Sequence, residues 1–297
     1  MTKISALILF TLAVCACSEN KNAESNSAAD STVTPVTQSV SPSPSLQKVW
    51  ETDTVLTTVE STLYDTKSDL IYTSNIEGHH SKKDGKGSIS KLKTDGTISQ
   101  LKWVTGLNAP KGMTILNDKL YVTDIDEVVE INMGDGKIAK RYPVPGATFL
   151  NDAANDGSKV YVSDSQTGKV HVLENGKVST LTEGMEGING LALNDKGMLF
   201  ILDGKGLKQY NMQDKGTKFI NEVVTGGDGL VIIDENTYIA SRWQGQIYLV
   251  RNGKEELLLD TQADSSNTAD IDYIKDQKLL LVPTFMKNRV VAYKLDY

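Results

Sequence analysis

The chain has 297 residues, with 38 acidic and 31 basic side chains, and its formal net charge is −7. Its densest basic run is only Lys82-Lys83, so it lacks the clustered cations that a nucleic-acid-binding surface needs, and that class is excluded. Both cysteines lie within residues 1–17, so the rest of the chain can form neither a disulfide nor a zinc site that needs cysteine.

Residues 1–17 have the features of a secretory signal. A basic start is followed by an apolar run that is too short to cross a bilayer of roughly 30 Å. The run ends in Val-Cys-Ala-Cys, which resembles a bacterial lipobox, and Ser18 follows it. The segment predicts a lipoprotein signal peptide, lipidation of Cys17 and an outer-membrane location in the cell envelope, either periplasmic or surface-facing. The alternative is an ordinary cleaved signal with two incidental cysteines.

Residues 18–48 are rich in Ser, Asn, Thr, Ala and Pro and contain almost no large apolar side chain. Such a segment cannot bury enough surface to offset the entropy lost on ordering. We therefore expect a disordered Ser/Thr/Pro-rich tether that joins the anchor to one folded domain, residues 49–297. A single domain of this length is ordinary for a closed β architecture.

Six hydrophobic strands recur in the folded part, about forty residues apart, and each ends in a small or acidic residue. A second strand follows each of them, and turn signals such as Asn175-Gly176 and Asn252-Gly253 come next. Several short strands in a repeat of this length predict an all-β fold, a six-bladed β-propeller. The six strands are residues 70–74, 120–124, 160–164, 199–203, 237–241 and 279–283.

A propeller must also join its two ends. Residues 48–52 precede the first repeat and have the character of a strand. We expect them to pair with the last strands, near residues 290–295, so that no sheet edge stays open.

One polar residue stands about ten residues before each of the six strands, where the innermost strand of a blade begins. If the blades are equivalent, the six side chains converge near one mouth of the central channel. Carboxylate and amide oxygens suit Ca²⁺, Mg²⁺ or Mn²⁺, and three negative charges with one positive charge sum to −2, which matches one divalent cation. The residues are Glu60, Lys111, Asn151, Asn189, Asp228 and Asp270.

Two other interpretations of this set remain open. Asn and Asp also begin inner strands because they make tight turns. Lys111 could instead pair with Glu60 or Asp270 and leave no cation site.

Four short motifs fall on the same set. Glu60 opens the stretch Glu-Ser-Thr-Leu-Tyr, Asn151 is followed by Asp, and both Asn189 and Asp228 are followed by Gly-Leu. Over roughly residues 50–297, these motifs and their order resemble the family of senescence marker protein, gluconolactonase and luciferin-regenerating enzyme. The resemblance implies a six-bladed propeller whose divalent metal, Ca first and Mg, Mn or Zn as alternatives, is held by these four residues. It also implies that Asp228 is a general base.

Two departures from the family pattern concern the substrate. Glu60 is followed by Ser-Thr where the family has Gly-Pro. Phe149 stands two residues before Asn151, where gluconolactonase-like members carry an arginine that binds substrate. Lys111 could supply that charge from another blade.

The favoured hypothesis is a monomeric, metal-dependent hydrolase that acts on a small-molecule lactone or a related ester. Asp228 would take a proton from the attacking water, and Lys111 would orient the leaving oxygen or a substrate carboxylate. Arg242 and Trp243 follow the fifth strand and are candidates to bind substrate. The loop 75–86, which contains two adjacent histidines, is a candidate lid.

The alternative hypothesis is a non-catalytic propeller that binds a ligand or a protein and carries a structural metal ion. Under either hypothesis no nucleic acid is involved, and the lipid anchor is the only predicted contact with a membrane.

Overall fold

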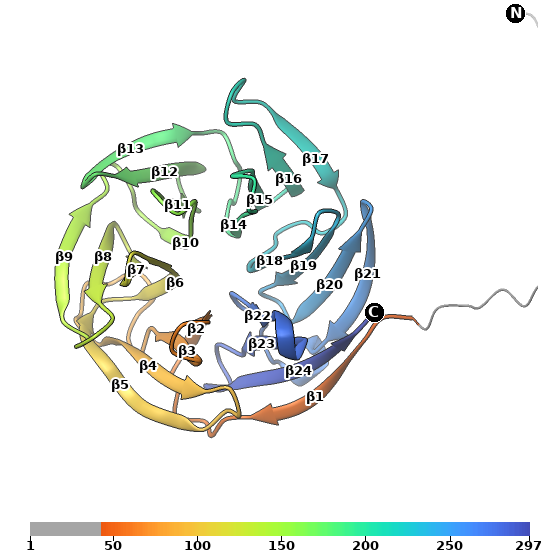
Figure 1. Cartoon of the computed structure of the whole chain (residues 1–297), viewed down its shortest axis with the longest axis horizontal. Helices are drawn as coiled ribbons and strands as arrows, with labels where there is room; N and C mark the ends of the chain where they lie inside the picture. The colour runs from red at the N-terminus through yellow and green to blue at the C-terminus, as the bar shows by residue number, and fades with distance from the viewer. Residues whose placement is uncertain (1–42) are drawn as a thin grey trace, which may run out of the picture. The chain divides into compact units, whose positions relative to one another are not determined.

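The structure, a computed structural model, describes residues 43–297. The predicted signal peptide, the lipidation site Cys17 and residues 18–42 of the expected tether lie outside the described residues. Within the described part, six four-stranded antiparallel sheets are arranged around a central axis (Figure 1). The predicted all-β, six-bladed β-propeller is therefore confirmed. No helix in residues 43–297 is long and apolar enough to span a membrane.

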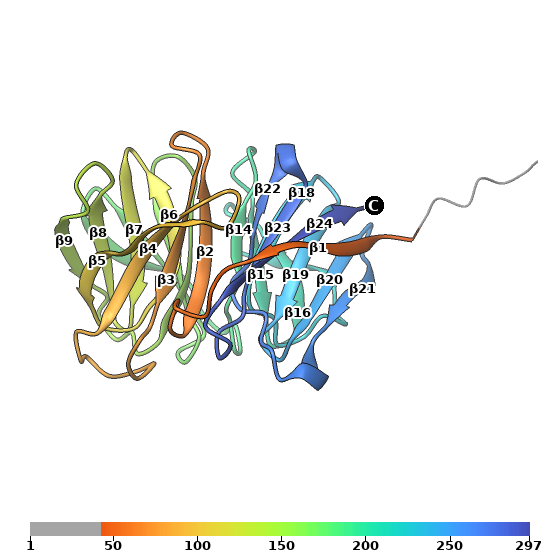
Figure 2. The same ribbon diagram turned by 90° about the horizontal axis from the view of Figure 1, so that it is seen from below.

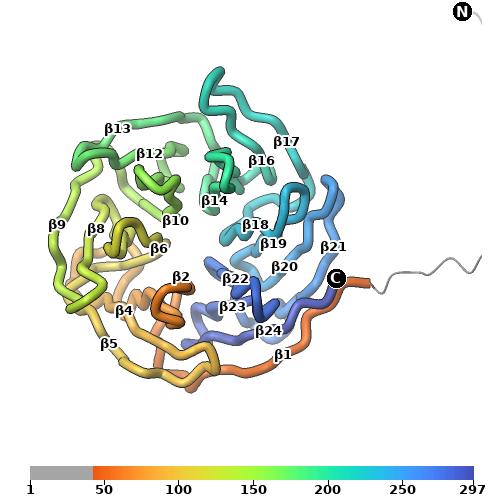
Figure 3. The backbone as a smooth tube through the Cα atoms, in the orientation of Figure 1, coloured from red at the N-terminus to blue at the C-terminus, as the bar shows by residue number. Residues whose placement is uncertain are grey.

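In the first five blades, four strands follow one another in chain order from the axis to the rim, and the backbone trace makes this path easy to follow (Figure 3). Blade by blade, the strands are β2 (Val59–Asp65), β3 (Leu70–Asn75), β4 (Gly87–Lys93) and β5 (Ile98–Leu107); β6 (Pro110–Leu116), β7 (Lys119–Asp124), β8 (Glu127–Asn132) and β9 (Ile138–Pro143); β10 (Leu150–Asn155), β11 (Val160–Asp164), β12 (Lys169–Glu174) and β13 (Lys177–Thr182); β14 (Leu191–Leu193), β15 (Leu199–Asp203), β16 (Gly206–Tyr210) and β17 (Thr217–Asn221); and β18 (Leu230–Asp234), β19 (Thr237–Arg242), β20 (Gln246–Arg251) and β21 (Lys254–Asp260).

The sixth blade joins the two ends of the folded part. It contains β22 (Asp272–Ile274), β23 (Leu279–Pro283) and β24 (Val290–Asp296), with β1 (Ser45–Glu51) as its outer strand. Two short 3₁₀ helices, η1 (Gln262–Asp264) and η2 (Lys275–Gln277), flank β22.

The strand β1 closes the ring. It runs antiparallel to β24, with Trp50 opposite Ala292 and Glu51 opposite Val291 (Figure 2). The indole Nε1 of Trp50 donates to the carbonyl oxygen of Thr94 in the first blade at 2.9 Å, so this residue links the sixth blade to the first. The predicted pairing of residues 48–52 with the last strands is confirmed, and the pairing reaches back to Ser45, before the expected domain boundary at residue 49.

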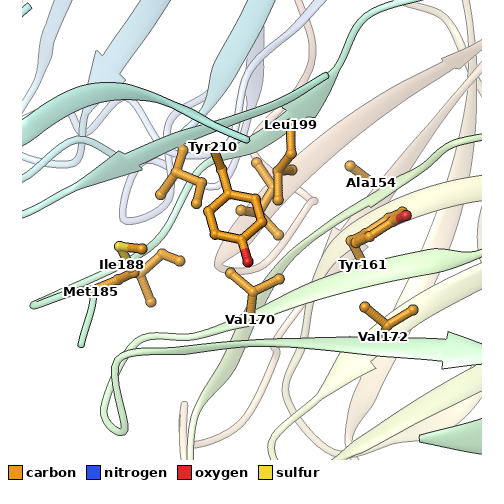
Figure 4. Close-up of a cluster of buried hydrophobic side chains, with 10 residues drawn as sticks. Ala154, Tyr161, Val170, Val172, Met185, Ile188, Leu199 and Tyr210 are labelled. Atoms are coloured by element: carbon orange, nitrogen blue, oxygen red, sulfur yellow. The ribbon is translucent and has the colours of Figure 1, made fainter. Parts of the chain in front are cut away.

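The hydrophobic core lies between neighbouring blades. On β15, Leu199 and Ile201 pack in the cluster between the third and fourth blades, whereas Phe200 and Leu202 pack in the cluster with the fifth blade. This is the two-residue alternation of a strand whose two faces are both covered. Figure 4 shows the first of these clusters, where Tyr210 of β16 lies near Val170, Met185 and Ile188.

Glycines allow the innermost segments of neighbouring blades to approach closely. A Cβ built on Gly112 would lie 2.5 Å from the Cα of Asp152, and one on Gly229 would lie 2.3 Å from the backbone nitrogen of Ile271. Backbone atoms of an inner strand cannot move aside as a flexible side chain can. The glycine that follows Lys111, Asn189 and Asp228 is therefore required by packing around the channel.

We predict that Gly229→Ala lowers stability by about 1–3 kcal/mol, because the added methyl group overpacks the contact with the sixth blade. A thermal melt of the purified variant checks the prediction. Gly134→Ala is the matched control, since a Cβ at Gly134 meets no atom within 4 Å. Equal melting temperatures for the two variants would show that the close approach at Gly229 is not a constraint.

Candidate functional site

In the second and third blades, an acidic residue at the end of the second strand holds the start of the inner strand of the same blade. Asp124, at the end of β7, accepts hydrogen bonds from the backbone nitrogens of Asn108 (2.9 Å) and Ala109 (2.7 Å), directly before β6. Asp164, at the end of β11, accepts them from Thr148 (3.1 Å) and Phe149 (3.2 Å), directly before β10. These two acidic strand ends thus position residues that line the channel.

Five of the six predicted channel residues line one cavity, with a volume of about 470 Å³. Their backbones occupy equivalent places in successive blades: Asn189 N donates to Leu202 O (3.0 Å) and Asp228 N donates to Ser241 O (2.8 Å). Equivalent blades therefore bring together side chains that are far apart in sequence, as predicted. The five residues are Glu60, Lys111, Asn151, Asn189 and Asp228.

The predicted position of Asp270 in this ring needs correction. In the sixth blade the equivalent backbone hydrogen bond, to Pro283 O at 3.0 Å, comes from Ala269 N. Asp270 is the next residue, and because successive side chains of an extended segment point in opposite directions, it does not line the cavity with the other five. It accepts a hydrogen bond from Ser61 Oγ at 2.6 Å. The distance in sequence between inner and second strand varies by one residue among blades, and counting back from the second strand could not detect this shift.

The polar residues Glu60, Lys111, Asn151, Asn189 and Asp228 form the floor of the cavity. Two oxygens on this floor have no hydrogen-bond partner. They are Glu60 Oε2 and Asn189 Oδ1, and both are buried. The Asn189 amide nitrogen donates to Asp228 Oδ1 at 3.1 Å, and the Asn151 amide nitrogen donates to Ser165 Oγ at 3.1 Å. Because both amides use their nitrogens in these bonds, their oxygens remain to accept from or ligate another group. Burying unpartnered oxygens is costly, so a ligand that satisfies them would stabilise the site.

This donor set fits a hard divalent cation, because it consists of carboxylate and amide oxygens without sulfur or imidazole. Only two of the four donors, Glu60 and Asp228, are acidic. Within residues 43–297, no group of three or more His, Cys, Asp or Glu side chains is arranged to hold a metal ion. The amides of Asn151 and Asn189 are therefore needed to complete the set.

Burial dominates the electrostatics of the floor. It raises the pKa of Glu60 well above its usual value, and the carboxylates of Asp228 and Asp152 raise it further while Lys111 opposes them. Burial, with a contribution from Asp152, raises the pKa of Asp228 to about 7, and hydrogen bonding from Asn189 opposes the rise. Carboxyl groups in such surroundings take up protons unless positive charge compensates them.

Lys111 forms no ion pair with Glu60 or Asp270, the alternative that would have left no cation site. Its ammonium donates to the carbonyl oxygens of Ala109 (3.1 Å) and His80 (3.4 Å) and lies 4.4 Å from the centre of the Phe149 ring. Burial lowers the pKa of Lys111, whereas the negative charge of Glu60 raises it. Lys111 and Glu60 therefore interact through the attraction of their opposite charges, without a direct hydrogen bond.

Of the two predicted substrate-binding residues, only Trp243 lies at the cavity. Trp243 lines the cavity, whereas Arg242 donates from Nη1 to Gln246 Oε1 (2.8 Å) and is not among the lining residues. The loop 75–86 reaches the cavity through Ile76 and His80, which agrees with its expected place above the mouth. Phe285 and Met286, in the loop after β23, also line the cavity; no motif in the sequence indicated them.

A second set of carboxylates, which the sequence analysis missed, links neighbouring blades; Asp152 is buried and Asp272 is half-buried. Asp152 Oδ2 accepts from the backbone nitrogen of Leu191 in the fourth blade at 2.6 Å. Asp272 Oδ2 accepts from the backbone nitrogen of Tyr64 in the first blade at 2.6 Å. These bonds between innermost segments explain the two residues structurally. The sequence signal for Asp152 was its place directly after the channel residue Asn151, and Asp272 had no such signal.

The raised pKa values predict how stability depends on pH. Asp152 and Asp228 both have a pKa raised to about 7, so the folded state favours their protonated forms. This contribution to stability is complete below the unfolded pKa of about 4 and is lost as pH rises to about 7. In the presence of a chelator, we expect the melting temperature to fall by on the order of 5–10 °C between pH 4.5 and pH 8. Asp228→Asn should flatten this dependence, and an equal slope in that variant would contradict the assignment.

Comparisons with known proteins support the fold. No protein-family model and no curated protein matches the chain. A solved structure assigned as a gluconolactonase is similar, with a TM-score of 0.65, 16% sequence identity and coverage of 86% of this chain and 94% of that one. Streptogramin B lyase is similar with a TM-score of 0.59, 12% identity and coverage of 86% and 98%.

A chain in a nidogen/laminin complex is similar with a TM-score of 0.60, 14% identity and coverage of 70% of this chain and 86% of that one. At these identities the likeness shows the six-bladed fold. The resemblance suggested by the sequence motifs is thus borne out in architecture, since a gluconolactonase-assigned structure is among the similar ones.

Proposed function

We propose that this protein is a divalent-cation-dependent hydrolase of lactones or related cyclic esters. The observation that carries the proposal is the arrangement on the floor of the cavity, where the buried carboxyl group of Asp228 lies beside the unpartnered oxygens Glu60 Oε2 and Asn189 Oδ1. A carboxyl group placed in this way can hold a cation and can take a proton from water. The likeness to a gluconolactonase-assigned structure supports the same reaction class.

Glu60, Asn151, Asn189 and Asp228 would hold the cation. When bound, the cation supplies positive charge that polarises the ester carbonyl and stabilises the oxyanion that develops on it. Ca²⁺ is the first choice because it accepts a mixed set of carboxylate and amide oxygens. Mg²⁺, Mn²⁺ and Zn²⁺ are the alternatives.

The residues of the chain supply the proton transfers. Asp228 takes a proton from a water molecule, and the water oxygen forms a bond to the carbonyl carbon of the ring. The ring C–O bond then breaks, and the proton passes from Asp228 to the departing oxygen, so the product is an open-chain hydroxy acid. The Lys111 ammonium provides positive charge on the same floor and orients the departing oxygen. Water is the only co-reactant.

The test is turnover by the purified protein on a panel of lactones and aryl esters, with and without a chelator. We expect hydrolysis that the chelator abolishes and that one divalent cation restores. No turnover of any compound, together with a melting temperature that the cation raises, would contradict the hydrolase and support the alternative.

The alternative is a non-catalytic propeller that binds a ligand and carries a structural cation. One observation favours it: no arginine in residues 43–297 lines the cavity, because Phe149 stands before β10 and Arg242 lies outside. A charged substrate group would find only Lys111.

A further inference from the structure

The cavity has a polar floor and an apolar rim. The rim is built by four segments from different blades: the loop after β3, the residue before β10, the loop after β19 and the loop after β23. Four of its six side chains are purely apolar, and the polar groups among them are the His80 imidazole and the Trp243 indole N–H. They are Ile76, His80, Phe149, Trp243, Phe285 and Met286.

The rim side chains pack against one another around the opening. The Phe149 ring meets the edge of His80 at a centroid distance of 5.9 Å, and the Trp243 ring meets Phe285 at 5.6 Å. The Phe149 ring also contacts the Lys111 ammonium, whose nitrogen lies 4.4 Å from the ring centre. Each pair combines residues from distant segments, so the aromatic rim is a product of the fold.

Part of this rim remains exposed to solvent. Trp243 is 40% exposed and Met286 is 62% exposed. Large apolar side chains exposed around a concave site of a few hundred Å³ are typical of a ligand-binding pocket, in which they pack against the apolar part of the ligand. Phe285 has a φ of +46°, a conformation that bulky residues rarely adopt, so the backbone accepts strain where it presents this ring.

The rim offers little to a sugar. Arg242 donates to Gln246, and the Asn151 amide nitrogen donates to Ser165, so neither group is available to substrate hydroxyl groups. The unpartnered buried oxygens lie on the floor, where the ester carbonyl would sit, and the rim adds only the His80 imidazole and the Trp243 indole N–H as polar side-chain groups. A ring with hydroxyl groups on every carbon would bury several of them against aromatic side chains without partners, which is costly.

We propose that the substrate is a lactone that carries an alkyl or aryl substituent, with the ester on the polar floor and the substituent against the aromatic rim. This rests on the proposed function for the reaction at the ester. The cavity volume of about 470 Å³ suits a small molecule of this kind.

Six-membered lactones that differ only in their substituents test the proposal. The probes are δ-valerolactone, which has none, δ-decalactone, which has a pentyl chain, and glucono-δ-lactone, which is polyhydroxylated. A pentyl chain that is half buried should raise kcat/KM about 30-fold over δ-valerolactone, given about fourfold for each methylene group that is fully buried. Glucono-δ-lactone should be a poor substrate.

Trp243→Ala should lower kcat/KM for δ-decalactone about tenfold more than it lowers kcat/KM for δ-valerolactone, because only the longer substrate reaches the rim. Phe219→Ala is the matched control, since Phe219 is also 40% exposed but lines a different cavity. Met286→Ser repeats the test at a second rim position, and melting temperatures confirm that each variant folds.

Turnover that is equal for the alkyl and unsubstituted lactones, or greatest for glucono-δ-lactone, would overturn the proposal and leave the hydrolase intact. If no lactone is hydrolysed, binding of the matching δ-lactams decides, measured by calorimetry. Affinity that rises with the alkyl chain and falls in Trp243→Ala would support the apolar subsite although the proposed reaction had failed. Affinity independent of the chain would overturn the subsite as well.

Discussion

Asp228→Asn is expected to lower kcat for lactone hydrolysis by at least about 100-fold, the usual contribution of a general base. The substitution keeps the size of the side chain and removes its ability to take a proton from water. It also removes a carboxyl group whose burial raises its pKa to about 7. The fold should be retained, because the amide side chain can still accept a hydrogen bond from Asn189. Steady-state kinetics and a thermal melt measure the two effects.

Asp270→Asn is the matched control for this experiment. Asp270 is also buried and acidic, and burial raises its pKa well above the usual value. It lies one residue beyond the position equivalent to Asp228 and does not line the cavity. Its variant should keep wild-type turnover. Equal loss in both variants would mean that charge in the channel, and not proton transfer by Asp228, sets the rate.

Removal of β1 is expected to have the largest effect on stability. A chain that begins at Thr52 loses the strand that pairs with β24 and the Trp50 contact with the first blade. Partial burial of the Trp50 side chain contributes roughly 1–2 kcal/mol, the hydrogen bonds between β1 and β24 add to this, and the exposed edge of β24 becomes a site for aggregation. We therefore expect the melting temperature to fall by on the order of 10 °C or more.

Two further truncations make this experiment sharper. A chain that begins at residue 43 keeps all of β1 and should melt like the full-length protein. A chain that begins at residue 49 loses the pairs from Ser45 to Lys48 but keeps Trp50, so its stability should be intermediate. The same melting temperature for all three chains would contradict the closing role of β1.

The sequence predicted the repeat, the closure and most of the floor because each depends on a local pattern that recurs. The hydrophobic second strands and the polar residue before each of them indicate one blade geometry in successive repeats, and three of the second strands share an acidic end. Rotational equivalence then brings Glu60, Asn151, Asn189 and Asp228 together without further information.

The features that the sequence did not predict depend on details outside the repeat. Asp270 was placed in the ring because one residue of spacing separates it from Ala269, and a shift of one residue turns a side chain to the other direction. Phe285 and Met286 lie in the loop after β23, and the loops between second and third strands differ in length and sequence from blade to blade. The apolar character of the rim became visible only when four separate segments met in space.

Calorimetric titration of Ca²⁺ into the chelator-treated protein tests the central claim most directly. We predict one bound cation per chain, an affinity at least tenfold weaker in Glu60→Gln, and unchanged affinity in Asp270→Asn. Absence of binding by Ca²⁺ and by the alternative cations, or equal affinity in Glu60→Gln and the wild type, would contradict the assignment of Glu60, Asn151, Asn189 and Asp228 as one cation site.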